Sequence, residues 1–371
     1  MLRRQRALDQ AIDLSRADPR LHDILRLGAY QLLELARVPA YAAVATSVDL
    51  AREIAGEPAA KFVNQALRKL ARSGGGERGA VRSHPDWLLV RWAKRFGPAG
   101  AERLAAWNDA KPPVTLQPAR WALETLRARL RDAGIGVTDA PFGAGLQVTG
   151  KRPPGLPGFT EGGFLVQDAA QALVCRFAAV PADRLVYDAC AAPGGKAVTL
   201  EATGERVRVI AGDARRSGLS HLVAAAWRCG VAIRVLAADL LSAPFPPRSL
   251  DAVLVDAPCT ATGTMARHPD ARWRITERAI ARAAERQRRL LEAGAGLVRP
   301  GGLLVYATCS LEPEENVAIV ETFLSRHPEF ARAPVAGAVP GALVTAAGDF
   351  ESLPQRDGID GAYAARLARH S

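Results

Sequence analysis

The chain has 371 residues, of which 49% are hydrophobic and 23% charged, so it is long enough for two or three globular domains. Its net charge of +11 favours a polyanionic partner such as nucleic acid, with a solvated basic surface as the alternative. The five cysteines lack a C-x-x-C pair, and no apolar run approaches the roughly 20 residues that span a bilayer. We therefore expect a cytoplasmic monomer with no membrane partner, no disulfide framework and no metal.

The N-terminal part of the chain is predicted to be helical. Apolar residues at helical spacing predict a helix over 20–35, and two further helices are expected over 42–55 and 59–72. The glycine-rich segment 73–76 is a plausible linker, and residues 84–112 continue the helical pattern. The alternative to a functional domain is that these helices form a small bundle with a purely structural role.

The rest of the chain predicts α/β structure. A small α/β subdomain is expected first, with strand, helix 123–133 and a strand that includes 146–148. Apolar strands then alternate with helices, which is typical of a parallel sheet covered on both faces. These strands are expected at 185–188, 207–213, 233–239, 252–256 and 303–307. The predicted domains are accordingly 1–73, 74–112, 113–163 and 164–371.

Four of the predicted strands end in an aspartate: Asp188, Asp213, Asp239 and Asp256. Ligands bind at the carboxyl ends of strands in such sheets, so the set indicates a site. For any single one of these aspartates a helix N-cap remains the alternative.

A turn rich in small residues follows the first of these strands, from Asp188 to Lys196. It lacks the G-x-G-x-x-G of NAD folds and the P-loop pattern, which leaves a nucleoside cofactor without phosphates, and S-adenosyl-L-methionine fits. Asp213, 25 residues beyond Asp188, is suited to bind ribose hydroxyls. A purely structural tight turn is the alternative. The candidate cofactor-binding residues of the turn are Cys190, Ala191, Ala192, Pro193, Gly194, Gly195 and Lys196.

Two cysteines, Cys259 and Cys309, each follow a predicted buried strand. A thiolate that adds to C6 of a pyrimidine makes C5 nucleophilic enough to attack an activated methyl group. Cys309 precedes a helix, whose N-terminus would stabilise a thiolate. Cys259 could assist release of the product, and Asp256 could accept a hydrogen bond from the exocyclic amine of a cytosine. The remaining cysteines, Cys175 and Cys229, are expected to be buried small hydrophobes, and Cys190 could simply line the cofactor turn.

Together these motifs resemble the RNA cytosine-C5 methyltransferases of the NusB-fused RsmB type, also called Sun or Fmu. The resemblance is carried by the turn 188–196, by Asp256-Ala257-Pro258-Cys259-Thr260 and by Thr308-Cys309-Ser310, and it covers the chain from about Arg20. It implies a Rossmann-like methyltransferase sheet after an all-α NusB-like RNA-binding domain and a small α/β subdomain. It also implies a specific cytosine of 16S (small-subunit) ribosomal RNA as substrate.

The resemblance assigns roles to individual residues. Cys309 is implied to be the nucleophile and Cys259 the product-release thiol. The turn 190–196 with Asp213, Asp239 and Asp256 is implied to contact S-adenosyl-L-methionine.

The chain departs from the family pattern at two places. The helices expected ahead of Leu21 are missing or reduced, and Gly218 stands where a basic residue is common. For the cofactor contact, Arg215 or Arg216 could substitute.

Other interpretations stay open at this stage. The same chemistry could act on tRNA, or the chain could be a non-catalytic RNA-binding assembly factor. Arg267, Arg272 and Arg274 could hold phosphates or lie in a solvated loop. The arginines of the following segment are expected on an exposed helix face: Arg282, Arg286, Arg288 and Arg289.

Overall fold

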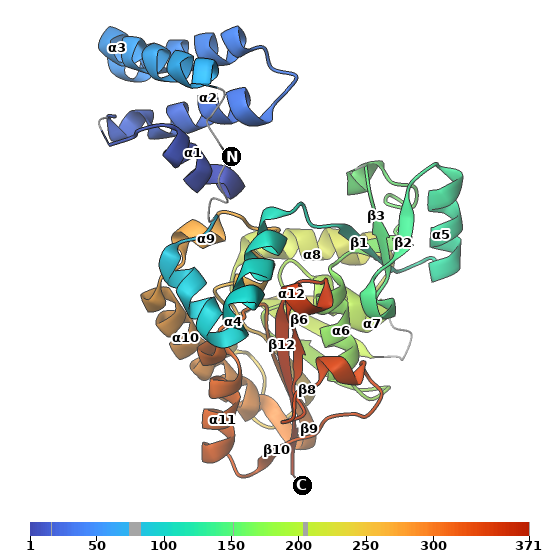
Figure 1. The fold of residues 1–371 in the computed structure, drawn as a ribbon. Coiled ribbons are helices and arrows are strands. Elements are labelled where there is room, and N and C mark those ends of the chain that lie inside the picture. The colour runs from blue at the N-terminus through green and yellow to red at the C-terminus, as the bar shows by residue number, and fades with distance from the viewer. Residues whose placement is uncertain (16, 74–82, 151, 203–206, 371) are drawn as a thin grey trace. The chain divides into compact units, whose positions relative to one another are not determined.

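The computed structural model describes residues 1–371 except 16, 74–82, 151, 203–206 and 371. The chain forms two compact units, whose elements are labelled in Figure 1. One unit comprises Met1–Lys111 and Ala266–Arg274, and the other comprises Pro112–Met265 and Ile275–Ser371. Of the linker predicted at 73–76, all but Ser73 lies outside the described residues.

The first unit is helical. Its long α3 is broken at Gly56, whose φ of 81° is a left-handed conformation that glycine adopts readily, so the two helices predicted over 42–55 and 59–72 are confirmed. Gly97, with φ 74°, divides α4 in the same way. The helices of this unit are α1 (Gln5–Ala11), α2 (His22–Glu34), α3 (Ala40–Ser73), α4 (Asp86–Asp109) and α9 (Ala271–Arg274).

The first three helices of this unit, α1, α2 and α3, share a core built from their buried apolar residues. A short helix, α1, lies ahead of Leu21 and contributes the buried Leu8. Central contributions come from Leu25, Val63 and Leu67. Among the described residues ahead of Leu21, the seven-residue α1 follows a 3-10 turn, Leu2–Arg4, and packs into this core.

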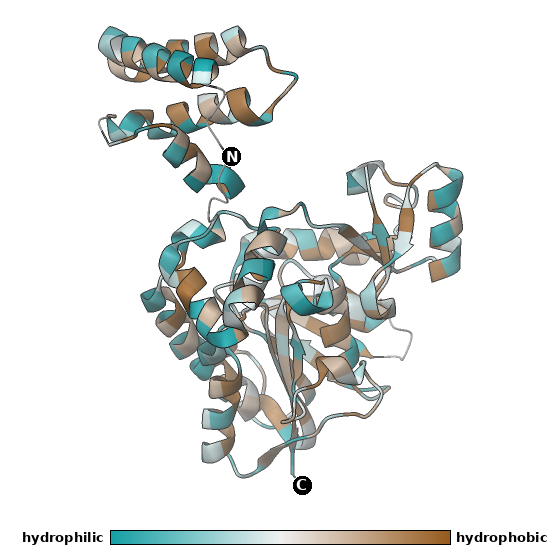
Figure 2. Cartoon of the chain, viewed as in Figure 1, coloured by the Kyte–Doolittle hydropathy of each residue, from teal (hydrophilic) through white to brown (hydrophobic). Residues whose placement is uncertain are grey.

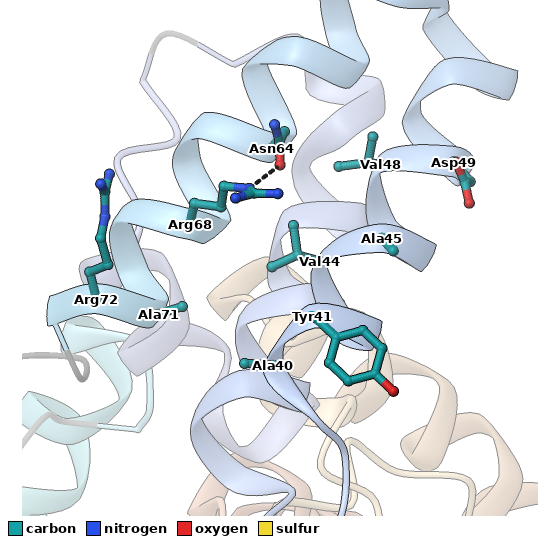
Figure 3. A pocket seen from close by; sticks show the side chains of 10 residues that line it. All are labelled: Ala40, Tyr41, Val44, Ala45, Val48, Asp49, Asn64, Arg68, Ala71 and Arg72. Atoms are coloured by element: carbon teal, nitrogen blue, oxygen red, sulfur yellow. Dashed lines mark hydrogen bonds between the residues drawn. The ribbon is translucent and has the colours of Figure 1, made fainter.

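A groove runs between the two halves of α3 (Figure 3). Its floor is apolar, with Val44 and Val48, and Tyr41 stands at its rim with 78% of its surface exposed. Arg68 and Arg72 extend from the other wall, where the Nε of Arg68 donates to Asn64 at 2.8 Å. This groove combines an exposed aromatic ring with two guanidinium groups.

The second unit begins with a small antiparallel sheet in the order β2-β3-β1-β4, covered by α5 (Leu123–Asp132). The last strand, β4, pairs antiparallel with β1, and Leu116 lies opposite Val166. The strand that completes this small sheet therefore comes after residue 163, where the boundary of the subdomain was predicted. The strands are β1 (Val114–Pro118), β2 (Val137–Asp139), β3 (Leu146–Val148) and β4 (Phe164–Val166).

A larger sheet has the order β10-β12-β9-β8-β5-β6-β7, with β11 paired to β12. The predicted parallel pairing is confirmed from β7 to β9, and β12 adds antiparallel to β9. Its strands are β5 (Leu185–Asp188), β6 (Arg208–Asp213), β7 (Arg234–Ala237), β8 (Leu250–Asp256), β9 (Val298–Thr308), β10 (Phe330–Arg332), β11 (Phe350–Ser352) and β12 (Ala362–Arg369).

Helices cover both faces of this sheet (Figure 1). Successive strand residues point to opposite faces, so Val186 packs with α6, α7 and α8 while Tyr187 packs with α10 and α11. The helices are α6 (Ala169–Ala178), α7 (Gly195–Ala202), α8 (Arg216–Cys229), α10 (Glu277–Leu297), α11 (Val317–Arg326) and α12 (Pro354–Asp357).

Hydrophilic and hydrophobic residues alternate along the helices, as expected for amphipathic elements (Figure 2). None of the helices in the described part of the chain is long and apolar enough to cross a membrane.

Candidate active site

The carboxyl ends of neighbouring parallel strands bring the predicted residues to one pocket. β5, β6, β8 and β9 end at Asp188, Asp213, Asp256 and Thr308 respectively. The loops that follow them line a pocket that contains the two predicted thiols, three of the four strand-end aspartates and Arg215. Among the predicted residues these are Cys190, Ala192, Asp213, Asp239, Asp256, Cys259 and Cys309.

The two thiols are adjacent. The Sγ atoms of Cys259 and Cys309 lie 3.3 Å apart, although the residues are 50 positions apart in the sequence. The loops are locked together by backbone hydrogen bonds, in which Gly263 N donates to the carbonyl oxygen of Cys309 at 2.9 Å. Gly263 must be a glycine, because a Cβ there would lie 2.5 Å from the carbonyl oxygen of Gly361.

The pair is electrostatically asymmetric. The hydrogen bond from the Cys259 thiol lowers the pKa of Cys309, and the charge of Lys196 acts in the same direction. The same hydrogen bond, together with burial, raises the pKa of Cys259 well above its usual value. Cys309 is therefore the thiol that ionises first, and a thiolate is the reactive form of cysteine.

The other cysteines are unreactive for a common reason. Cys175 and Cys229 are buried as predicted, and burial raises the pKa of both, for Cys175 to about 12. Cys190 lines the pocket, but burial and the charge of Asp188 raise its pKa as well. Cys309 is thus the cysteine whose pKa is lowered, which favours it as the nucleophile.

Beside the thiols lies a buried ion pair. The Nζ of Lys196 is 2.6 Å from Asp256 Oδ2, and it also donates to Gln171 Oε1. Burial disfavours the charged ammonium, but the charge of Asp256 and the hydrogen bond to Asp256 outweigh it and raise the pKa of Lys196. The pair fixes the Asp256 carboxylate at the edge of the pocket.

The strand-end aspartates have local roles as well. Asp213 accepts hydrogen bonds from the backbone N–H groups of Ala192 and Arg215, at 3.1 and 2.7 Å. Asp239 accepts from Leu241 N at 3.0 Å. Asp188 is fully buried, and burial and the charge of Asp256 raise its pKa to about 8. Asp188 does not line the pocket.

Part of the predicted cofactor turn lies outside this pocket. Ala191, Pro193, Gly194, Gly195 and Lys196 are not among the pocket-lining residues, and of these Ala191, Gly194 and Lys196 are buried while Pro193 is exposed. The glycine at 194 has a structural cause, because its φ is 108° and a Cβ there would lie 2.7 Å from Leu222 Cγ. The packing of α8 against the turn therefore requires a glycine at this position.

Several residues reach the site without having been predicted there. Arg286 of α10 is exposed, as expected, but it also lines the pocket, one helical turn before the pocket-lining Leu290. Glu315 and Gln287 are fully buried. They lie behind the thiol loops, the segments that follow β8 and β9 and carry Cys259 and Cys309. The helical period of α10 could have signalled Gln287, since it places this polar residue in line with the buried Ala284 and Leu291.

Arg272 is not a phosphate ligand. It is fully buried in the helical unit, where it pairs with Asp109 at 2.7 Å and donates to the carbonyl oxygens of Ser83 and Asn108. Arg274 is exposed and pairs with Asp270, as expected of a solvated segment.

Comparisons with known proteins agree with this geometry. Residues 177–368 match the family model described as 16S rRNA methyltransferase RsmB/F. Residues 2–72 match the NusB family, and 84–153 match the ferredoxin-like domain of RsmF/B-like methyltransferases. The chain belongs to the RsmB/F family of 16S rRNA methyltransferases. The match to NusB begins at residue 2, well ahead of the start near Arg20 that the motifs had indicated.

Curated relatives match nearly all of this chain and most of their own length. The probable ribosomal RNA small subunit methyltransferase B of Synechocystis sp. is 34% identical over all of this chain and 89% of its own. The ribosomal RNA small subunit methyltransferase B of Vibrio cholerae is 34% identical over 94% of this chain and 81% of its own. The predicted enzyme class and methyl donor, S-adenosyl-L-methionine, are those of this RsmB/F family.

Solved structures show the same fold. The crystal structure of PH0851 superposes with a TM-score of 0.85 at 24% identity and covers 99% of this chain and 88% of that one. NSun6 from Pyrococcus horikoshii with SFG has a TM-score of 0.67 at 18% identity and covers 78% of this chain and 99% of that one. The predicted architecture, a helical NusB-like region, a small α/β subdomain and a Rossmann-like sheet, is thus confirmed.

Proposed function

We propose that this RsmB/F-family methyltransferase modifies C5 of a specific cytosine in 16S ribosomal RNA through a transient bond between Cys309 Sγ and C6 of the ring. The observation that carries the proposal is the thiol pair. Two cysteines 3.3 Å apart, one with a lowered and one with a raised pKa, supply a nucleophile together with a hydrogen-bond donor to it.

The residues of the pocket suit the methyl donor. Asp213, Asp239 and Asp256 present carboxylates to one pocket, and carboxylates suit both ribose hydroxyls and a cationic sulfonium group. We propose that these aspartates, with Cys190 and Ala192, hold S-adenosyl-L-methionine. When bound, this cofactor supplies an electrophilic methyl group.

The chain's own groups account for the activation of the base. Addition of the Cys309 thiolate to C6 places electron density on C5, which then becomes nucleophilic. Asp256, held by Lys196 through one oxygen, has its second oxygen for the exocyclic amine of the cytosine. A base then takes the C5 proton, the electron pair of that C–H bond re-forms the C5–C6 double bond, and Cys309 leaves as a thiolate. We assign the neighbouring Cys259 to this release step.

Two substitutions test the assignment. Cys309→Ala should lower methylation of 16S rRNA by at least about 1,000-fold, because it removes the covalent step. Cys259→Ala should leave addition intact and accumulate a protein–RNA adduct that resists denaturing gels. Bisulfite sequencing of the rRNA locates the product.

Cys229→Ala is the matched control, since it removes a buried thiol that lies outside the pocket and should retain activity. Near-normal methylation by Cys309→Ala would overturn the proposal.

We also propose that the groove of the helical unit contacts the RNA. An exposed tyrosine opposite Arg68 and Arg72 supplies a stacking surface and phosphate-binding cations, and the net charge of +11 supports a polyanionic partner. We further propose that the enzyme acts as a cytoplasmic monomer. Light scattering of the purified protein, alone and with rRNA, tests the oligomeric state.

A further inference from the structure

The thiol loops are tied together by one buried carboxylate that the mechanism above does not use. Glu315 is fully buried at the end of the 3-10 turn Pro313–Glu315. It accepts hydrogen bonds from Thr260 N at 2.9 Å and from Ser310 Oγ at 2.7 Å, and the Thr260 hydroxyl donates to it as well. Thr260 directly follows Cys259 and Ser310 directly follows Cys309. A single side chain therefore holds the residues next to both thiols.

A second layer braces this arrangement. Gln287 of α10 donates to Glu315 Oε2 at 2.9 Å and to the carbonyl oxygen of Pro258 at 3.1 Å, so Cys259 is held on both sides. Asn316 accepts from the Thr308 hydroxyl at 2.6 Å and donates to the carbonyl oxygen of Ser310 at 2.8 Å, which brackets Cys309.

The negative charge of Glu315 is a second feature, separate from its hydrogen bonds. Within the described part of the chain no lysine or arginine forms an ion pair with Glu315, whereas Lys196 is paired with Asp256. Buried charges act over several ångströms because the protein interior screens them weakly.

We propose that Glu315 is a positioning residue that assigns different roles to two chemically identical thiols, keeping Cys259 protonated so that Cys309 is the nucleophile. This inference rests on the function proposed above. The surroundings of each thiol agree with it. Cys259 lies near Cys309, Glu315 and Tyr306. The hydrogen bond with Cys309 and burial raise its pKa most, and the charge of Glu315 adds to them. Cys309 faces Cys259, Asp256 and Lys196.

Glu315→Gln separates charge from geometry. The glutamine oxygen can accept from Thr260 N and Gln287, and its amide can donate to the hydroxyls of Thr260 and Ser310, which accept as readily as they donate. The contacts are therefore retained while the negative charge is lost. Glu314→Gln is the matched control, because it removes the same charge from the adjacent, exposed position.

The experiment measures which thiol reacts first. The full chain, without RNA or methyl donor, is alkylated with iodoacetamide to low conversion over a range of pH, and each cysteine is quantified by peptide mass spectrometry. The wild type and Glu314→Gln should react mainly at Cys309. Glu315→Gln should raise the share of Cys259 about tenfold, the change expected when the pKa of a largely protonated thiol falls by about one unit.

A second variant covers the case in which Glu315→Gln does not fold. Thr260→Val removes a hydroxyl contact but keeps the charge of Glu315 and the backbone bond, so Cys309 should stay the preferred thiol. The inference is overturned if folded Glu315→Gln alkylates like the wild type, or if Thr260→Val redistributes the reaction as strongly as Glu315→Gln. Because neither readout requires catalysis, its failure is distinct from retained methylation by Cys309→Ala, which would overturn the proposed function.

Discussion

The thiol pocket and the groove on α3 differ in how far their polar side chains are exposed to solvent. At the pocket, the groups that set the reaction are buried and hydrogen-bonded to one another: Lys196 to Asp256, and Glu315 to both thiol loops. At the groove, Tyr41 is 78% exposed, and Arg72 reaches outward from a helix. Bond-making chemistry needs fixed geometry and weak screening, whereas capture of a long polyanion needs exposed rings and cations.

This difference teaches how substitutions should behave. A change in the pocket should alter reaction rate and folding stability together, because the same contacts serve both. A change in the groove should alter RNA affinity alone. The predictions below test this contrast, starting with the largest effect.

Apart from Cys309→Ala, loss of the Lys196 cation should have the largest effect. Lys196→Met leaves Asp256 without its partner above the buried Asp188, so the unfolding free energy should fall by about 3 kcal/mol. Methylation should fall about 100-fold because Asp256 is no longer held against the pocket. Thermal unfolding and single-turnover methylation measure the two effects.

A double variant separates the effect on stability from the effect on methylation. Lys196→Met combined with Asp256→Asn removes the unpaired charge and should recover most of the stability but none of the activity. Recovery of activity as well would show that the ion pair serves folding alone, and the contrast between the two regions would then be weaker than stated.

The helical unit offers a smaller test, since it too contains a buried polar cluster. His84 is fully buried against Asn108, and burial followed by the charge of Arg272 lowers its pKa to about 3. The unfolded chain binds a proton near pH 6.5, so the folded state loses stability as the pH falls from about 6.5 toward 3. Wild-type protein should therefore lose more thermal stability between pH 7.5 and 5 than His84→Gln does.

His221→Gln, at an exposed histidine, is the control and should follow the wild type. An identical loss in His84→Gln and wild type would show that other groups govern the acid sensitivity of this unit.

Much of this architecture could be predicted from the sequence. Strand–helix alternation located the parallel sheet, and the two helices expected over 42–55 and 59–72 are the two halves of α3. Cys259 and Cys309 could be singled out because each follows a buried strand. Neighbouring parallel strands then placed them together, since β8 and β9 are adjacent in the sheet.

Apart from Gln287, which the helical period of α10 could have indicated, other residues take their place through tertiary contacts that no local pattern encodes. Glu315 looks like one member of an acidic turn until the fold brings Thr260 to it from 55 residues away. Arg272 sits in an arginine-rich stretch that reads as a phosphate-binding loop, yet Asp109 and two carbonyl oxygens draw it into the core. Long-range partners, rather than residue type, decide whether such charges are exposed.

The smallest expected effect is at the groove, and it tests the contrast most directly. Tyr41→Ala should weaken binding of a 16S rRNA fragment about three- to tenfold, since stacking of one base contributes about 1–3 kcal/mol and an open site realises only part of that. Filter binding measures the affinity. The unfolding temperature and the single-turnover rate at saturating RNA should not change, because the ring is largely exposed.

Two further variants locate the effect in the groove. Ile54→Ala removes another exposed apolar side chain of α3, outside the groove, and should bind like the wild type. Arg68→Gln and Arg72→Gln should each reduce the salt dependence of binding by roughly one counterion, as expected for a lost phosphate contact. If Ile54→Ala weakened binding as much as Tyr41→Ala, the RNA would be contacting the helix surface at large. A groove that binds bases by stacking requires the two to differ.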